Sequence, residues 1–315
     1  MKKHISNTKT HFKKAFTMLE LIFVIVIMGI LAKFGVEFLA QAYNSFIFSK
    51  INNELQSNSA SAVEFISKRL EHRIKDSVIV RNTDTNTKNP LVDSEDENAT
   101  VLEWIASDID GFRGDSDPYW SGIIDIDDGN ASTLVTKGTD TTKTNSLINI
   151  LSYGDSDIND SAIYFVGSSH ITTNPWGYDG NITDQYQTMH PIRSAVQSNT
   201  FIPTNGNSGA DNSFTGGGRI YEYYKLAWTA YAVRLDYNHT TNSGDLWLHY
   251  DYQPWRGDTY LLHSDGVTPT KSQLIMQNVS SFQFRAVGSL IKIQVCTKSL
   301  LTNEEYSICK EKTIF

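Results

Sequence analysis

The sequence predicts an α+β protein in which one long N-terminal helix precedes a β-rich head with long polar loops. An apolar segment near the N-terminus continues into a helical pattern, with no Pro or Gly from 36 to 80. The second half of the chain contains β-branched and aromatic runs separated by turn sequences. Hydrophobic residues make up 40% and charged residues 20% of the 315 residues, which is typical of a folded protein rather than a disordered one.

The first predicted element is an apolar helix over residues 16–40. These residues would span about 37 Å as a helix, enough to cross a bilayer. One acid, Glu20, interrupts the apolar stretch near its start. Because an isolated carboxylate inside hydrocarbon costs roughly 2–3 kcal/mol or more, Glu20 requires a partner. Lys33 and Glu37 lie near the other end, where their side chains can reach the interface.

The N-terminal residues 1–15 carry five lysines and no acid: Lys2, Lys3, Lys9, Lys13 and Lys14. This charge predicts a cytoplasmic N-terminus and an exported head. Removing the five charges from the formal net charge of −8 leaves −8 − 5 = −13. General nucleic-acid binding requires clusters of Lys and Arg, so we expect none from so acidic a chain.

The sequence Lys13-Lys14-Ala15-Phe16-Thr17-Met18-Leu19-Glu20, with the apolar run after it, resembles the class III signal of type IV prepilins and type II secretion pseudopilins. The resemblance implies that prepilin peptidase cleaves between Ala15 and Phe16 and that Phe16 is then N-methylated. It also implies that Glu20 guides assembly with other pilin-like subunits. The resemblance covers about the first tenth of the chain, and Ala15 stands where the family usually has Gly.

The implied role of Glu20 has a physical basis. Cleavage would turn Phe16 into a terminal ammonium, which Glu20 of a neighbouring subunit could neutralise. Breaking one partner of a buried ion pair costs far more than the pair contributes. We therefore expect Glu20 to set the register of assembly rather than to stabilise the subunit.

Two other interpretations of the N-terminal segment remain. One is an ordinary secretory signal, for which Ala40-Gln41-Ala42 offers a small-x-small cleavage site. Lys33 and Glu37 lie between the apolar region and that site, which is unusual for such a signal. The other is a simple uncleaved anchor that keeps Met1.

The next predicted element is an amphipathic continuation of the helix over residues 41–80, which gives about 55–60 helical residues in total. Its apolar stripe comprises Ile51, Leu55, Ala62, Ile66, Leu70 and Ile74. Residues 81–315 are predicted to form the head. Within it, residues 81–100, 130–146 and 198–218 are polar and are predicted to be loops.

The remaining elements are predicted strands. Residues 219–236 and 246–252 flank the turn sequence Thr241-Asn242-Ser243-Gly244 and should form a hairpin. Further strands are expected at 260–262, 281–286, 290–295 and 306–315. The segment 274–285 is similar to the late sheet region of large, W-like minor pilins and of the J-type minor pseudopilin. In those proteins an apolar strand follows a short helical or turn segment.

Cys296 and Cys309 are the only cysteines, with twelve residues between them. If the head is exported, an oxidising compartment favours a disulfide between them, which would join the last two strands. Two unpaired thiols are the alternative. Their number and spacing do not match a zinc site.

Acidic loops raise the question of bound calcium. Asp155, Asp157 and Asn159 place oxygen ligands at alternate positions, which suits Ca²⁺. However, Asp160 stands where the calcium-loop template has Gly, and Val166 where it has Glu. Calcium is therefore only a weak candidate, and no other cofactor is expected.

No hydrolase, zinc-protease or phosphate-loop motif occurs, so we expect a structural subunit rather than an enzyme. His239, His249 and His263 are expected to be surface residues. The mature length of 315 − 15 = 300 residues is large for a repeating filament subunit and favours a minor, tip-proximal or priming one. The filament could be a type IV pilus, a type II secretion pseudopilus or a DNA-uptake pseudopilus. The alternative is a membrane-anchored, exported adhesive or ligand-binding domain with a generic signal anchor.

Overall fold

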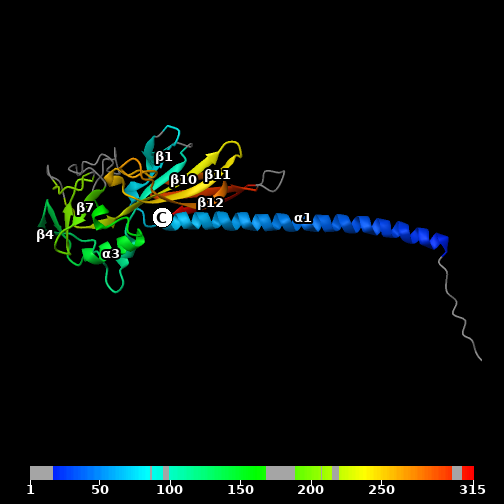
Figure 1. The fold of residues 1–315 in the computed structure, drawn as a ribbon, viewed down its shortest axis with the longest axis horizontal. Helices are drawn as coiled ribbons and strands as arrows, with labels where there is room; N and C mark the ends of the chain where they lie inside the picture. The colour runs from blue at the N-terminus through cyan, green and yellow to red at the C-terminus, as the bar shows by residue number, and fades with distance from the viewer. Residues whose placement is uncertain are drawn as a thin grey trace, which may run out of the picture. The chain divides into compact units, whose positions relative to one another are not determined.

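The computed structural model describes residues 17–85, 87–94, 99–167, 189–206, 208–214, 220–299 and 307–315. It contains one long helix, several short helices and two antiparallel sheets (Figure 1). The chain divides into two units, residues 1–54 and 55–315, and each is described by itself. The α+β class predicted from the sequence is confirmed.

Helix α1 (Met18–Leu70) runs through both units and has a different environment in each. In the first unit, none of the residues from Met18 to Glu54 is buried. In the second unit, the helix buries one face against a sheet. The buried residues of this face are Ser59, Ala62, Val63, Ile66, Ser67 and Leu70. The stripe predicted from helical periodicity therefore packs on the head from Ala62 to Leu70.

Two polar contacts accompany this apolar packing. The hydroxyl groups of Ser59 and Thr297 lie 3.3 Å apart. Lys312 Nζ donates to Glu64 Oε2 at 2.7 Å, and this hydrogen bond lowers the pKa of Glu64. Because the two contacts join the helix to different strands, they orient the helix on the sheet.

The helix ends at Leu70, so the predicted helical span to residue 80 is wrong. After Leu70 the chain joins a sheet: Ile74 N donates to Ile105 O at 2.9 Å, and Arg73 bridges to Ala106. A 3₁₀ turn, η1 (Lys75–Ser77), and strand β1 (Ile79–Arg81) follow. The backbone of these residues is hydrogen-bonded to a strand that lies far away in the sequence. Helical periodicity depends only on near neighbours, so it does not predict such bonds.

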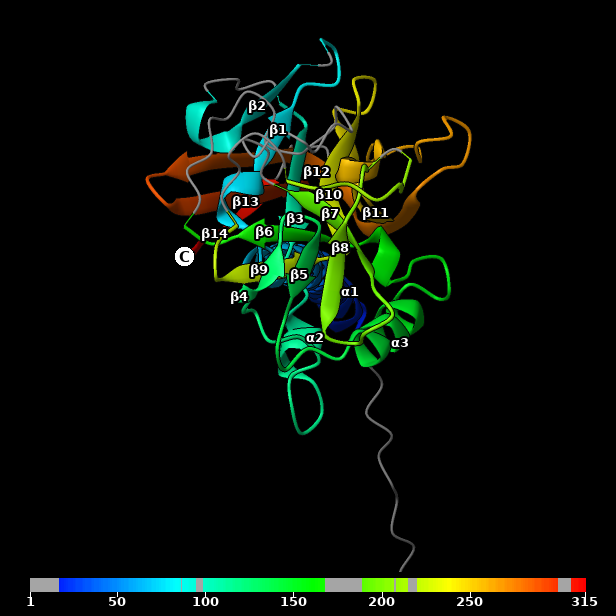
Figure 2. The same ribbon diagram turned by 90° about the vertical axis from the view of Figure 1, so that its left-hand side faces the viewer.

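The larger sheet has eight strands in the order β14-β13-β12-β11-β10-β3-β1-β2 (Figure 2). Besides β1, its strands are β2 (Lys88–Pro90), β3 (Val101–Ala106), β10 (Thr229–Asn238), β11 (Ser243–Tyr252), β12 (Lys271–Val287), β13 (Leu290–Lys298) and β14 (Ser307–Ile314). The turn η2 (Leu91–Asp93) follows β2. The predicted hairpin is confirmed as β10 and β11. The predicted loop over residues 81–100 in fact includes the short strand β2.

The disulfide between Cys296 and Cys309 is present, as expected from the sequence. The two residues face each other directly on β13 and β14. On a chain-entropy model, closing a loop of this length contributes about 3 kcal/mol to the free energy of unfolding.

Strand β12 differs from the late-sheet pattern expected for residues 274–285. It is one continuous strand from Lys271 to Val287, rather than a short helix or turn followed by a strand. The register of β12 shifts between Met276 and Val279 against β11 and between Val279 and Ser281 against β13. Asn278, which lies next to both shifts, has a φ of 59°. The predicted strand over 260–262 is absent, since Leu262 makes only an isolated bridge to Pro269.

The smaller sheet has six strands in the order β4-β5-β8-β7-β6-β9. These are β4 (Asp125–Asn130), β5 (Thr133–Val135), β6 (Ala162–Phe165), β7 (His190–Ser194), β8 (Thr200–Pro203) and β9 (Tyr224–Ala227). Helices α2 (Ile109–Arg113) and α3 (Thr141–Leu151) and the turns η3 (Ile158–Asp160) and η4 (Pro254–Arg256) complete the fold.

Two predicted loops therefore contain regular structure. Residues 130–146 include β5 and the start of α3, and residues 198–218 include β8. Asp140 caps α3 by accepting from the backbone N–H groups of Thr142 and Lys143. The buried ring of Phe201 anchors β8 in the core of the smaller sheet. Phe214, in the same polar stretch, is buried in this core as well. A few apolar residues in a polar segment can therefore fix it to a sheet, which its overall composition does not show.

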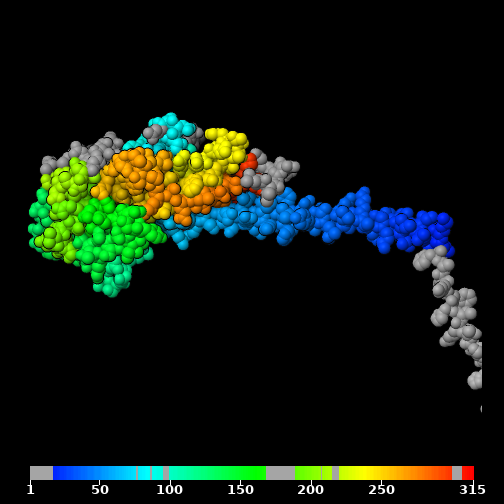
Figure 3. All heavy atoms as spheres, in the orientation of Figure 1, coloured from blue at the N-terminus to red at the C-terminus, as the bar shows by residue number. Residues whose placement is uncertain are grey.

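The predicted long strand over 219–236 is broken at Trp228. Residues before it form β9 in the smaller sheet, and residues after it form β10 in the larger sheet. The switch at Trp228 joins the two sheets of the head, which Figure 3 shows as one packed body of atoms. Apolar residues from both sheets, including Ile105, Ala162, Tyr252 and Trp255, form a common core.

Asp108 provides a test of the head by pH. Its buried carboxylate accepts from Gly111 N at 3.2 Å and from Trp120 Nε1 at 3.1 Å. Burial raises the pKa of Asp108, and the two hydrogen bonds lower it by a smaller amount. The resulting pKa is about 6. The folded state therefore binds more protons than the unfolded state between about pH 4 and pH 6. Over that interval we expect this group to reduce the free energy of unfolding by roughly 3 kcal/mol as the pH rises.

The variant Asp108→Asn should remove this dependence, so its stability advantage over wild type should grow from pH 4 to pH 7. Denaturant unfolding at several pH values measures the difference in stability. In a pH titration of the folded proteins, the Trp fluorescence of wild type should show a transition with a midpoint near 6 that Asp108→Asn lacks. Asp127→Asn, at an exposed position, is the matched control. Parallel pH profiles for wild type and Asp108→Asn would contradict the assignment.

Candidate assembly segment and polar sites of the head

The N-terminus of α1 is closed by a reciprocal pair of hydrogen bonds between Thr17 and Glu20. Thr17 N donates to Glu20 Oε2 at 3.0 Å, and Glu20 N donates to Thr17 Oγ1 at 3.4 Å. The Thr17 hydroxyl also donates to the same carboxylate oxygen at 2.9 Å. This arrangement is a capping box. It supplies hydrogen-bond acceptors to backbone N–H groups at the start of the helix that would otherwise be unsatisfied.

The capping box gives Glu20 a partner within its own chain. The expected partner lay only on a neighbouring subunit, and Thr17 was not part of that expectation. The signal was present, because Thr-x-x-Glu directly before an apolar run is the sequence signature of a capping box. The cleavage bond inferred between Ala15 and Phe16 lies outside the described residues.

The helix surface that follows the capping box is apolar and exposed. In the first unit, its exposed large residues include Leu21, Ile22, Phe23, Val24, Ile25, Val26, Ile27, Met28, Ile30 and Leu31. By length and composition, α1 is the one helix in the described part of the chain that could cross a membrane. In other proteins, large exposed apolar surfaces of this kind contact lipid or another apolar helix.

The calcium candidates are engaged in other contacts. Asp155 Oδ2 lies 2.7 Å from Lys271 Nζ. Asp157 caps the turn η3 by accepting from Asn159 N at 2.6 Å. Asn159 Oδ1 accepts from Ser194 N at 3.2 Å. Among the described residues, no group of three or more His, Cys, Asp or Glu side chains is arranged to hold a metal ion.

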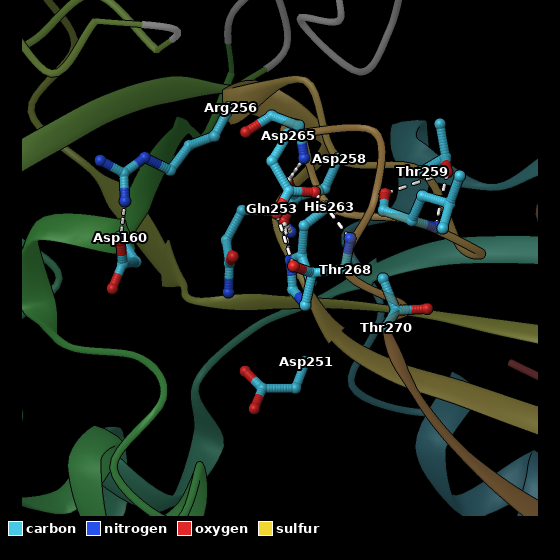
Figure 4. A network of polar contacts seen from close by, with 12 residues as sticks. Asp160, Asp251, Gln253, Arg256, Asp258, Thr259, His263, Asp265, Thr268 and Thr270 are labelled. Atoms are coloured by element: carbon cyan, nitrogen blue, oxygen red, sulfur yellow. Dashed lines mark hydrogen bonds and ion pairs between the residues drawn. The ribbon is translucent and has the colours of Figure 1, made fainter.

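A polar network organises the segment that follows β11 (Figure 4). The buried carboxylate of Asp258 accepts from Gln253 N at 2.9 Å and from Ser264 N at 2.7 Å. Its Oδ2 also lies 3.0 Å from His263 Nδ1. In the described part of the chain, the His263 ring hydrogen-bonds to no nucleophilic side chain. The network therefore shapes the loop that follows β11.

His249 differs from the expectation that it lies on the surface, since it is only 9% exposed. Burial, followed by the charge of Arg234, lowers the pKa of His249 to about 4, so the ring is neutral at pH 7.

At the β10–β11 turn, the side chains of Asp236, Tyr237, His239 and Asp245 line an open groove.

A scan against protein-family models and searches of curated proteins and of solved structures found no significant match to the chain.

Proposed function

We propose that the protein is a pilin-like structural subunit that assembles through the N-terminal part of α1. The observation that carries the proposal is the exposed apolar surface of α1, which begins directly after the capping box of Thr17 and Glu20. The capping box accounts for Glu20 within a single chain. In a shared helical core of several subunits, the same carboxylate would also pair with the terminal ammonium of a neighbouring chain.

In this proposal the chain first crosses the inner membrane once, with its basic N-terminus in the cytoplasm and its head in the periplasm. Prepilin peptidase then cleaves between Ala15 and Phe16 and methylates Phe16. The exposed apolar surface passes from lipid into contact with the helices of other subunits, so it never meets water.

The size of the head supports a minor subunit at or near the filament tip, or one that primes assembly. Unit 2 alone spans residues 55–315. A large head is hard to repeat along a tightly packed helical rod but is easily placed at its end. Type IV pili, type II secretion pseudopili and DNA-uptake pseudopili all fit this role.

Mass spectrometry of the mature N-terminus tests the proposal. Protein purified from membranes of the native host should begin at N-methylated Phe16. The variant Ala15→Leu should retain residues 1–15, because a bulky side chain replaces the small residue before the cleaved bond. Ala42→Leu is the matched control: it removes the small-x-small site of an ordinary secretory signal and should leave the Phe16 terminus unchanged.

A mature chain that begins at Met1 or at Tyr43 would overturn the proposal. It would favour an exported adhesive or ligand-binding domain on a generic anchor instead.

A further inference from the structure

A cluster of reactive groups surrounds the amino group of Lys271, at the start of β12. Lys271 Nζ lies 2.6 Å from Asp251 Oδ2 and 2.7 Å from Asp155 Oδ2. It also donates to Ser152 O at 2.5 Å. An amine held against a carboxyl group, with a second carboxylate beside it, contains the components needed for amide formation.

Asp251 is held in this position by an unusual backbone. It has a φ of 58°, a left-handed conformation that costs a residue other than glycine about 1–2 kcal/mol. It is the extra residue at a β-bulge, since Ala230 pairs with Tyr252 and Tyr231 with Tyr250. Asp251 N donates to Thr229 Oγ1 at 2.9 Å. Local strain that directs one side chain into a polar interior is typical of functional positions.

The Asp251 carboxyl group is buried and polarised. The residue is 3% exposed, so water has little access to it. Ser156 Oγ donates to Asp251 Oδ1 at 2.7 Å. Gln253 Nε2 in turn donates to Ser156 Oγ at 3.2 Å, which directs the serine proton toward Asp251. A donor at this place can stabilise the negative charge that develops on Oδ1 when Cγ is attacked.

The amine must lose a proton before it can attack. Burial lowers the pKa of Lys271, but the hydrogen bonds to Asp155 and Asp251 outweigh burial and raise it overall. The resting state is thus the ammonium ion, and a base is needed. Asp155 is in contact with Nζ, and its side chain is 65% exposed, so it can accept and release protons. We therefore expect a slow reaction that follows folding.

We propose that Lys271 and Asp251 form an intramolecular isopeptide bond, with Asp155 as the proton carrier. Asp155 takes a proton from the Lys271 ammonium, and the free Nζ forms a bond to Asp251 Cγ. Asp155 then passes this proton and the second amine proton to Oδ2, the Cγ–Oδ2 bond breaks, and Oδ2 leaves as water. The ammonium and carboxylate become an amide and one water molecule, Asp155 is regenerated, and no other reactant is consumed.

The fold lowers the barrier of the reaction by holding the two groups together. Well-oriented groups within one molecule react with effective concentrations of about 10⁵–10⁸ M. The bond would join β11 to β12, while the disulfide joins β13 to β14. Four consecutive strands of the larger sheet would then be linked in two covalent pairs. This inference concerns the head alone and does not depend on the proposed function.

Tryptic mapping of the full-length protein, purified from membranes in detergent, tests the bond. Trypsin should not cleave after an acylated Lys271. We expect a branched peptide of residues 235–256 joined to 257–285, lighter by one water than the sum of its parts. The variant Lys271→Arg keeps the ion pair with Asp251 but cannot form the bond. This variant should fold but give separate peptides. Its unfolding temperature should be lower than that of the linked wild type.

Two further variants separate the chemistry from simple packing. Asp251→Asn should give the same branched peptide with loss of ammonia, because the amide nitrogen then leaves in place of water. Asp155→Asn should fold normally, since the site is exposed, but should remain unlinked. Separate peptides from folded wild-type protein, even after days at 37 °C, would overturn the proposal and leave Lys271 and Asp251 as an ion pair. Full linkage in Asp155→Asn would overturn the role of Asp155.

Discussion

Replacing Glu20 by Gln is expected to leave the protein in the membrane and to abolish its co-purification with other pilin-like subunits. The amide side chain of this variant could still accept the hydrogen bond from Thr17 N, because Gln also serves in capping boxes. What the variant lacks is the charge that would pair with the terminal ammonium of a neighbouring Phe16. Breaking such a buried pair costs about 3–5 kcal/mol, which corresponds to more than a hundredfold in association.

Thr17→Ala is the matched control for Glu20→Gln. It removes the Thr17 hydroxyl that accepts from Glu20 N but keeps the acid. The loss of an N-cap side chain costs roughly 0.5–2 kcal/mol of helix stability. We expect assembly of Thr17→Ala to be weakened at most. If Glu20→Gln assembled normally and Thr17→Ala did not, Glu20 would act as a helix cap and not as a partner between subunits.

The largest expected effect on stability comes from the Arg81→Met variant. Arg81 Nε donates to Glu103 Oε1 at 2.7 Å, and Glu103 has no solvent exposure. Tyr252 OH supplies a second hydrogen bond to this carboxylate at 3.3 Å. Removing Arg81 leaves a buried charge without its cation, so we expect a loss of about 3–5 kcal/mol in the free energy of unfolding.

The pH dependence of the Arg81→Met variant has a defined sign. Burial raises the pKa of Glu103, and Arg81 offsets this rise only in part in the wild type. Without Arg81, the pKa of Glu103 should rise further above its value in the unfolded state, so the dependence of stability on pH should be steeper than in the wild type. The variant should therefore regain stability as the pH falls and lose it as the pH rises.

Denaturant unfolding at several pH values measures these effects. The double variant Arg81→Met with Glu103→Leu should recover most of the loss, since it replaces both charges by apolar groups. Arg193→Met is the matched control at an exposed pair, in which Arg193 Nε lies 2.6 Å from Asp211 Oδ1. It should cost about 0–1 kcal/mol. Equal losses in Arg81→Met and Arg193→Met would contradict the role assigned to the buried pair.

Several features of the fold could be predicted because neighbours in sequence determine them. The helical stripe at Ala62, Ile66 and Leu70 depends on residues three or four apart, and these residues are buried as the spacing implies. The β10–β11 hairpin follows from a turn sequence between two β-forming runs. The disulfide was the favoured pairing because the chain has only two cysteines, and the structure shows it. Pilin-like processing and assembly stay predictions.

Other features depended on partners that lie far away in the chain. The end of α1 at Leu70 is set by hydrogen bonds between the following residues and the strand β3. The division at Trp228 separates residues of similar composition into two sheets, because β6 pairs with one part and β3 with the other. The local sequence pattern is the same on both sides of Leu70 and on both sides of Trp228. It therefore could not predict where the helix ends or where the chain passes from one sheet to the other.

The sequence by itself therefore determined that the chain has a long, apolar N-terminal helix with an acid near its start and a β-rich head. These features rest on local periodicity and charge, whereas the disulfide was favoured by the sequence and decided by the structure. Only the tertiary structure decided that Lys271 meets Asp251 and Asp155, and that Glu103 is buried against Arg81. Such contacts form when strands and loops distant in sequence pack together, and the energy of a buried charge is set by what then surrounds it.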